Sequence, residues 1–168
     1  MTEDCERIFG RTEEFSVGIA WHEHQSPKLQ YVRLSVSVGG VCVKGDDWID
    51  IRDLAQTMKP VVGYADYREC CELFSGDPTL VVDRLDEAQM SDIPLVLNGA
   101  SIDDFARFNL LLHPALRGCS IWALSCAGRS KVLLKRDKQQ TVCAEFSNTD
   151  LSNTLLRAYQ WCDDIAYN

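Results

Sequence analysis

The sequence lacks the patterns that mark most metal centres and covalent active sites. Its eight cysteines form no Cys-x-x-Cys pair, the spacing that zinc sites and thioredoxin-like redox sites share. It has three histidines, of which only His22 and His24 lie close together, and a catalytic zinc needs three protein ligands. Gly-x-Ser-x-Gly, phosphate-loop and dinucleotide-binding motifs are also missing. We therefore expect no catalytic residue, no metal and no cofactor.

Long hydrophobic runs are missing too. No stretch approaches the roughly 20 apolar residues of a membrane span. The first residues, Met1 to Glu6, are polar and acidic, whereas a secretory signal has a basic start and an apolar core. These features predict a cytoplasmic protein. A reducing cytoplasm would keep all eight cysteines as free thiols.

The sequence has fewer basic than acidic residues. The chain has 17 Lys and Arg against 25 Asp and Glu, a net charge of −8. An acidic surface repels nucleic acid and anionic membranes, so neither is expected as a partner. It suits a basic partner, although solubility alone explains the charge equally well.

What is present predicts one globular domain spanning residues 1–168. The length suits a single domain, and 46% hydrophobic with 25% charged residues is ordinary for a folded protein. Side chains that alternate between polar and apolar predict a strand most clearly over Tyr31 to Val38. Other predicted strands are Phe15 to Trp21, Val41 to Val43, Cys119 to Cys126, Lys131 to Lys135 and Thr141 to Phe146.

Apolar positions three and four apart predict two main helices. The first runs from Asp47 to Met58, ended by Lys59-Pro60, and the last follows a Thr149 cap. Between them we expect a strand over Thr79 to Val82 and a helix over Asp83 to Met90. Another helix is expected from Ser101, with Asp103 and Asp104 at its start, to His113-Pro114. Strands, helices, strands and a helix in this order predict an α+β fold, a mainly antiparallel sheet packed with helices.

Several carboxylates have no evident local role. Asp50 and Asp53 share the outward face of the first predicted helix, where they cap nothing. Asp163 and Asp164 lie near a helix C-terminus, where a carboxylate costs about 0.3–1 kcal/mol. Asp46 and Asp47 are explained in part by a helix start. A solvated face is the plain interpretation of each, and contact with a basic partner is the alternative.

Two segments in the first third of the chain resemble a known family. They are Ile8-Phe9-Gly10-Arg11-Thr12-Glu13-Glu14-Phe15-Ser16-Val17 and Val36 to Asp46, the latter followed by Ile51 and Leu54. The pattern is similar to the immunity protein family numbered forty-two of bacterial polymorphic toxin systems. This family includes immunity proteins of contact-dependent growth inhibition.

The resemblance implies a cytosolic protein that binds one toxin domain and blocks it, and it supplies no catalytic residues. With the acidic balance, it predicts a basic toxin domain as partner, contacted through Asp46, Asp47, Asp50, Asp53, Asp163 and Asp164. Trp48 and Tyr167 are candidate aromatic anchors. Two other interpretations remain open: a small enzyme or ligand-binding domain whose site is not contiguous in sequence, and an adaptor of a secretion system. Nothing in the sequence specifies an oligomeric state.

Overall fold

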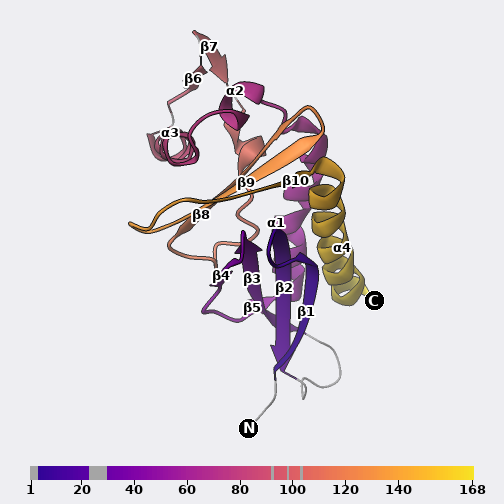
Figure 1. The fold of residues 1–168 in the computed structure, drawn as a ribbon. Coiled ribbons are helices and arrows are strands. Elements are labelled where there is room, and N and C mark those ends of the chain that lie inside the picture. Colours follow the sequence, from indigo (N-terminus) through magenta and orange to yellow (C-terminus); the bar gives the residue numbers. More distant parts are fainter. Residues whose placement is uncertain (1–3, 23–29, 92, 98, 103) are drawn as a thin grey trace.

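The computed structural model describes residues 4–22, 30–91, 93–97, 99–102 and 104–168 (Figure 1). The strands are β1 (Asp4–Arg11), β2 (Phe15–His22), β3 (Tyr31–Val38), β4 (Val41–Lys44), β5 (Ile49–Asp50), β6 (Leu95–Leu97), β7 (Ala100–Ile102), β8 (Cys119–Cys126), β9 (Arg129–Arg136) and β10 (Val142–Ser147). The helices are α1 (Ile51–Gly63), α2 (Cys71–Phe74), α3 (Pro78–Ser91) and α4 (Asn148–Tyr167), with 3₁₀ turns η1 (Ala65–Tyr67) and η2 (Phe105–Phe108). The predicted α+β class with antiparallel sheets is confirmed. Within the described ranges, no helix is long and apolar enough to span a membrane.

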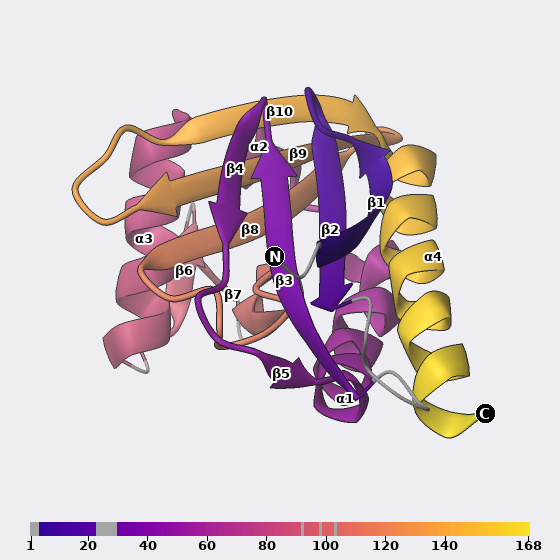
Figure 2. The ribbon, with the colours of Figure 1, turned by 90° about the horizontal axis from the view of Figure 1, so that it is seen from below.

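The first sheet has the strand order β1-β2-β3-β4, and β5 pairs with β3. Its strands alternate, as the sequence predicts: Val17, Ile19 and Leu34 on the inner face are 0% exposed. The outer face carries Ser35 and Ser37, short side chains that leave the sheet surface polar. No described helix covers this outer face, which is turned toward the viewer in Figure 2.

The second sheet, β10-β9-β8, crosses behind the first (Figure 2). A two-residue turn joins β8 to β9, and Ala127 and Gly128 both have positive φ there (50° and 79°), as a type I′ hairpin requires. Both faces of this sheet are buried. Ile121 and Val132 face a core shared with β1–β4, whereas Trp122 and Leu133 face a second core.

The two cores lie on opposite sides of the second sheet, and helices cover each of them. α1 and α4 lie side by side over the first core, into which Leu54, Met58, Leu155 and Cys162 project with 0% exposure. α3 covers the second core (Figure 1), where its Leu85 is also 0% exposed.

Arg68 connects the two cores. Its side chain is 1% exposed, and its Nε donates a hydrogen bond of 3.1 Å to the Arg107 carbonyl, next to Phe108 of the second core. Its Nη2 donates to the carbonyl of Val61, which belongs to the first core. Burial lowers the pKa of this guanidinium to about 10, so the two carbonyl dipoles stabilise a charge that has lost most of its water.

The predicted first and last residues of the first helix are both wrong. α1 begins at Ile51 because Ile49 and Asp50 pair with β3 as β5. It also continues through Pro60 to Gly63. Pro60 offers no N–H to the carbonyl of Gln56, but Gln56 is exposed to water. Burial of Val61, 8% exposed, favours the extra turn.

Two predictions for the middle of the chain are wrong. Thr79 to Val82 is helical: α3 begins at Pro78, a residue favoured at the first helical position, and Asp77 accepts a 3.0 Å hydrogen bond from the Leu80 amide. The helix expected from Ser101 to His113 is instead β7 and the short turn η2. Asp104 caps η2 without a side-chain hydrogen bond, and Asp103 lies outside the described residues.

The C-terminal helix is confirmed, with its cap two residues earlier than predicted. Ser147 rather than Thr149 is the N-cap, and its hydroxyl accepts a 3.1 Å hydrogen bond from the Asp150 amide. Residues 23–29, which include His24, lie outside the described residues.

Candidate functional site

The predicted contact aspartates lie in three places. Asp46 and Asp47 lie on the connection between β4 and β5 and are exposed. Asp50 and Asp53 lie at the start of α1, and Asp163 and Asp164 lie in the last turns of α4.

The fold brings four of these six together. Helices α1 and α4 are antiparallel neighbours (Figure 2), so the start of one lies beside the end of the other. Arg52 fixes this arrangement, because its Nε donates a 3.3 Å hydrogen bond to the carbonyl of Ala166. We call the surface formed by Asp50, Asp53, Asp163 and Asp164 the acidic end.

Two members of the acidic end have local partners that the sequence did not reveal. Asp50 is the N-cap of α1, and its Oδ1 accepts a 2.8 Å hydrogen bond from the Arg52 amide. Asp53 Oδ2 lies 2.9 Å from Nε2 of His113, a residue only 8% exposed. The prediction that Asp50 and Asp53 cap nothing is therefore wrong for Asp50, and Asp53 has a structural partner.

The remaining aspartates are held more loosely. Asp47 pairs with Arg117 at 3.1 Å, with both side chains exposed. Asp163 accepts a 3.4 Å hydrogen bond from the hydroxyl of Tyr159. Burial is the main cause that raises the pKa of the Tyr159 hydroxyl, and the negative charge of Asp163 raises it further. Asp164 is exposed near the negative end of the α4 dipole, so helix stability does not explain it.

The two candidate aromatic anchors differ in accessibility. Tyr167 is 59% exposed and follows Asp163 and Asp164 on α4. Trp48 is half-buried outside both cores. Its ring lies 4.1 Å from that of His22, and the Arg33 guanidinium lies 4.5 Å from it. Tyr167 is therefore the more accessible anchor beside the acidic end.

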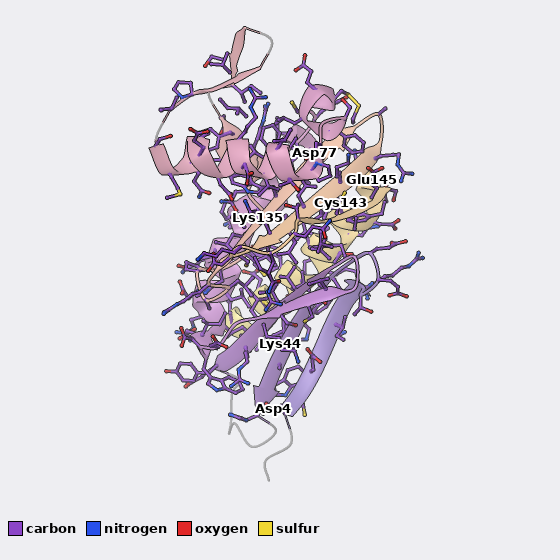
Figure 3. All side chains as sticks on the ribbon, turned by 60° about the vertical axis from the view of Figure 1, so that its left-hand side comes forward. Asp4, Lys44, Asp77, Lys135, Cys143 and Glu145 are labelled. Carbon is purple, nitrogen blue, oxygen red and sulfur yellow. A yellow bond between two sulfur atoms is a disulfide. The ribbon has the colours of Figure 1, made fainter. Side chains whose placement is uncertain are left out.

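His22 has a partner other than a metal ion. Its Nδ1 lies 2.7 Å from Asp4 Oδ1. Asp4 and Lys44, both labelled in Figure 3, line a shallow hollow of about 140 Å³ on the outer face of the first sheet. Carboxylates and cations alternate there, so this face has no dominant sign of charge.

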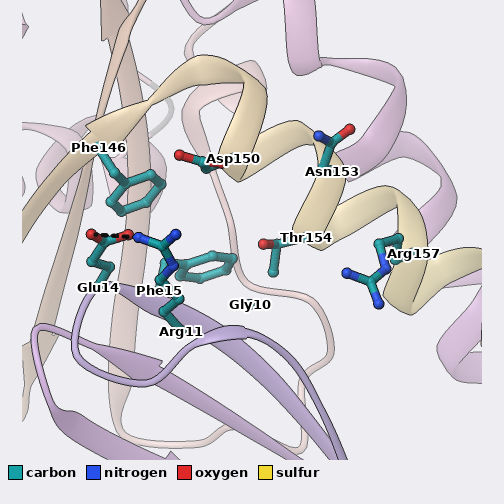
Figure 4. Close-up of a pocket in the computed structure, with 9 residues that line it drawn as sticks. All are labelled: Gly10, Arg11, Glu14, Phe15, Phe146, Asp150, Asn153, Thr154 and Arg157. Atoms are coloured by element: carbon teal, nitrogen blue, oxygen red, sulfur yellow. Dashed lines mark ion pairs between the residues drawn. The ribbon is translucent and has the colours of Figure 1, made fainter.

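A second candidate site, which sequence analysis missed, is a cavity of about 280 Å³ between the β1–β2 turn and α4 (Figure 4). We call it the polar pocket. It is lined by Gly10, Arg11, Glu14, Phe15, Phe146, Asp150, Asn153, Thr154 and Arg157. These residues come from β1, the β1–β2 turn, β2, β10 and α4, so no spacing in the sequence could have joined them.

The bonding state of the cysteines differs from the prediction. Cys71 and Cys126 form a disulfide, so the prediction of eight free thiols is wrong. The cause is tertiary: the Arg68 carbonyl and the Cys70 amide hydrogen-bond to Ser125 at 2.8 and 2.9 Å, which places the start of α2 against the end of β8. Burial raises the pKa of the Cys119, Cys143 and Cys162 thiols, the last to about 12, which makes them poor nucleophiles at neutral pH.

Comparisons with known proteins identify the fold. No protein-family model and no curated protein matches the sequence. Among solved structures, the chain has the fold of an immunity protein. That structure is CdiI from Burkholderia dolosa AUO158, with a TM-score of 0.70 over 92% of this chain and 99% of that chain, at 14% sequence identity. The predicted resemblance to immunity proteins is thereby confirmed for the fold, well beyond the first third of the chain.

Proposed function

We propose that this chain is a cytoplasmic immunity protein that binds and neutralises a cognate secreted toxin domain. The observation that carries the proposal is the shared fold with CdiI, an immunity protein of contact-dependent growth inhibition, over nearly the full length of both chains. The whole chain, residues 1–168, would act as one immunity-type domain. The two short segments that resemble immunity proteins lie within this fold and support the same conclusion.

The action we propose is stoichiometric binding rather than catalysis. An immunity protein has to cover or distort the toxin's active surface, which requires complementary shape and charge and no reacting group. The three thiols with raised pKa values are poor nucleophiles, in agreement with such a role. We expect one chain to inactivate one toxin domain.

The acidic end is the contact surface that we propose, extended by Asp46 and Asp47 on the adjoining loop. A net charge of −8 steers the chain toward a basic toxin domain, and four carboxylates at one end of the helix pair give the encounter an orientation. Tyr167, 59% exposed, supplies a large side chain that a partner can bury at the same end.

The experiment has to separate binding from folding. Reversing Asp50 or Asp53 would also disturb the α1 cap or the contact with His113. We therefore use the double variant Asp163→Lys/Asp164→Lys. The control is Glu72→Lys/Glu87→Lys, which changes the net charge equally at exposed positions of α2 and α3.

Binding to the cognate toxin domain is measured by surface plasmon resonance at low and physiological salt, with thermal unfolding as the folding control. We expect the α4 variant to associate at least about tenfold more slowly at low salt, and the control variant to stay near the parent. Equal association rates for the parent, the α4 variant and the control variant would show that the acidic end is not part of the interface. Failure of the parent to bind the toxin or protect cells from it would reject the immunity function itself.

A further inference from the structure

The polar pocket and the acidic end occupy different parts of α4. The α4 residues of the pocket are Asp150, Asn153, Thr154 and Arg157, all in the first half of the helix. Asp163 and Asp164 follow Arg157 by six residues or more, about 9 Å farther along the helix axis. The acidic-end proposal therefore leaves the pocket without a function.

The pocket contains one cation that nothing neutralises. Arg11 pairs with Glu14 at 3.6 Å, and both belong to the pocket wall (Figure 4). Asp150 accepts a 2.7 Å hydrogen bond from the Ser147 hydroxyl and lies in the positive first turn of α4. Within the described ranges, Arg157 has neither an acidic partner nor a hydrogen-bond acceptor for its side chain.

A neutral donor accompanies this cation. Thr154 is three residues before Arg157, so the two side chains share one face of α4. The residue is only 8% exposed, and its hydroxyl is directed into the pocket in Figure 4. It makes no hydrogen bond to another described residue, so it is available to donate one to a ligand.

The floor of the pocket is aromatic. Phe15 and Phe146 are 3% and 6% exposed and stack with ring centroids 6.1 Å apart. Gly10, with φ of +92°, brings the end of β1 close to α4, because a Cβ there would lie 2.4 Å from the Phe15 carbonyl oxygen and 2.8 Å from Thr154. This close approach shapes an apolar base below the polar groups.

We propose that the polar pocket binds a carboxylate on a short apolar stem. The Arg157 guanidinium donates two parallel hydrogen bonds to the carboxylate, and the Thr154 hydroxyl donates a third. The stem lies on the Phe15–Phe146 floor. A volume of about 280 Å³ falls just below the range typical of drug-sized ligands and suits a group of a few heavy atoms.

Charge selects a single carboxylate over other groups. A phosphate dianion carries two negative charges, whereas Arg157 supplies a single positive charge and Asp150 in the same wall repels the excess. A cation would meet Arg157, while Glu14 is already neutralised by Arg11. The carboxylate has two sources, a free small acid or an acidic side chain that a docked protein presents.

The probe is sodium butyrate, matched against n-butylammonium chloride at equal ionic strength. Each salt is titrated into the purified protein while the backbone amide NMR signals of the protein are recorded. Butyrate is expected to shift the signals of Gly10, Thr154 and Arg157 saturably, and butylammonium is not. Arg157→Gln and Thr154→Val should each weaken butyrate binding about tenfold. Arg117→Gln, which removes a guanidinium outside the pocket, should leave it unchanged.

The two sources are then distinguished with the toxin complex. Loss of toxin affinity in Arg157→Gln assigns the carboxylate to a toxin side chain, whereas butyrate binding that persists in the complex assigns it to a free acid. Either result supports the site. Non-saturating shifts, equal shifts with the ammonium salt, or unchanged affinity in folded Arg157→Gln and Thr154→Val would overturn it. The butyrate titration uses the isolated chain, so its failure is distinct from failure of the immunity function.

Discussion

Asp53 and His113 are 60 positions apart in sequence, yet their side chains lie 2.9 Å apart. His113 Nδ1 accepts a 3.0 Å hydrogen bond from the Ala115 amide, so a neutral ring carries its proton on Nε2 and donates it to Asp53. The imidazole thereby links the first turn of α1 to the loop before β8. This contact makes Asp53 a structural residue as well as a member of the acidic end.

Replacing His113 should therefore destabilise the fold. In His113→Ala the Ala115 amide loses its acceptor in a buried loop, and Asp53 loses its donor. We expect the free energy of unfolding to fall by about 1–3 kcal/mol, measured by urea denaturation. Asp53→Asn, whose amide oxygen can still accept from Nε2, is the matched control and should lose less. Equal, small losses in both variants would show that the contact is not structural.

Reduction should destabilise the protein without any mutation. The Cys71–Cys126 disulfide closes a loop of 55 residues, and opening it should lower the free energy of unfolding by about 2–4 kcal/mol. Thiol titration of denatured, unreduced protein should approach the six cysteines that remain unpaired. The variant Cys71→Ser/Cys126→Ser should not respond to reductant. A count of eight thiols, with no effect of reductant on the parent, would contradict the bond.

The packing of α4 can be tested with two adjacent leucines. Leu155 is 0% exposed in the first core, whereas Leu156 is 39% exposed. Leu155→Ala should lower the free energy of unfolding by about 2–5 kcal/mol, because it leaves a cavity in the core. Leu156→Ala, with the same change in composition, should lower it by less than about 1 kcal/mol. Chemical denaturation of both variants measures the difference.

Stability should fall in alkaline solution. Burial, reinforced by Asp163, raises the pKa of the Cys162 thiol from its ordinary value near 9.0 to about 12. Above pH 9 the unfolded chain releases this proton and the folded chain keeps it, so the unfolded state binds fewer protons and stability declines toward pH 12. Cys162→Ala should reduce this slope, measured by denaturation between about pH 8 and 10.5, where the thiol begins to titrate in the unfolded chain alone. Cys42→Ala, at an exposed position, should keep it.

Local patterns in the sequence were sufficient for much of the framework. The alternation over Tyr31 to Val38 and the apolar stripe of the last helix correspond to β3 and α4, because one buried face imposes a period on each. The pattern failed at Val81 and Val82, whose β-branched side chains favour strands. There the capping by Asp77 and burial in the second core outweigh intrinsic propensity.

The candidate sites were less accessible to sequence analysis. The aspartates of the acidic end were identified, but their proximity depends on the antiparallel pairing of α1 and α4, held by Arg52 and Ala166. The polar pocket gave no signal, because Arg11 and Arg157 come from opposite ends of the chain. Likewise, no spacing links Cys71 to Cys126, which meet only after α2 packs on β8.

The connection made by Arg68 has a consequence for behaviour in acid. Its two acceptors, the carbonyls of Val61 and Arg107, carry no titratable proton, unlike the carboxylates that pair with His113 and with Lys131. Below neutral pH the guanidinium stays charged, because its pKa of about 10 lies well above that range, and the carbonyl dipoles stay in place. The junction between the two cores should therefore keep its hydrogen bonds as the solution is acidified.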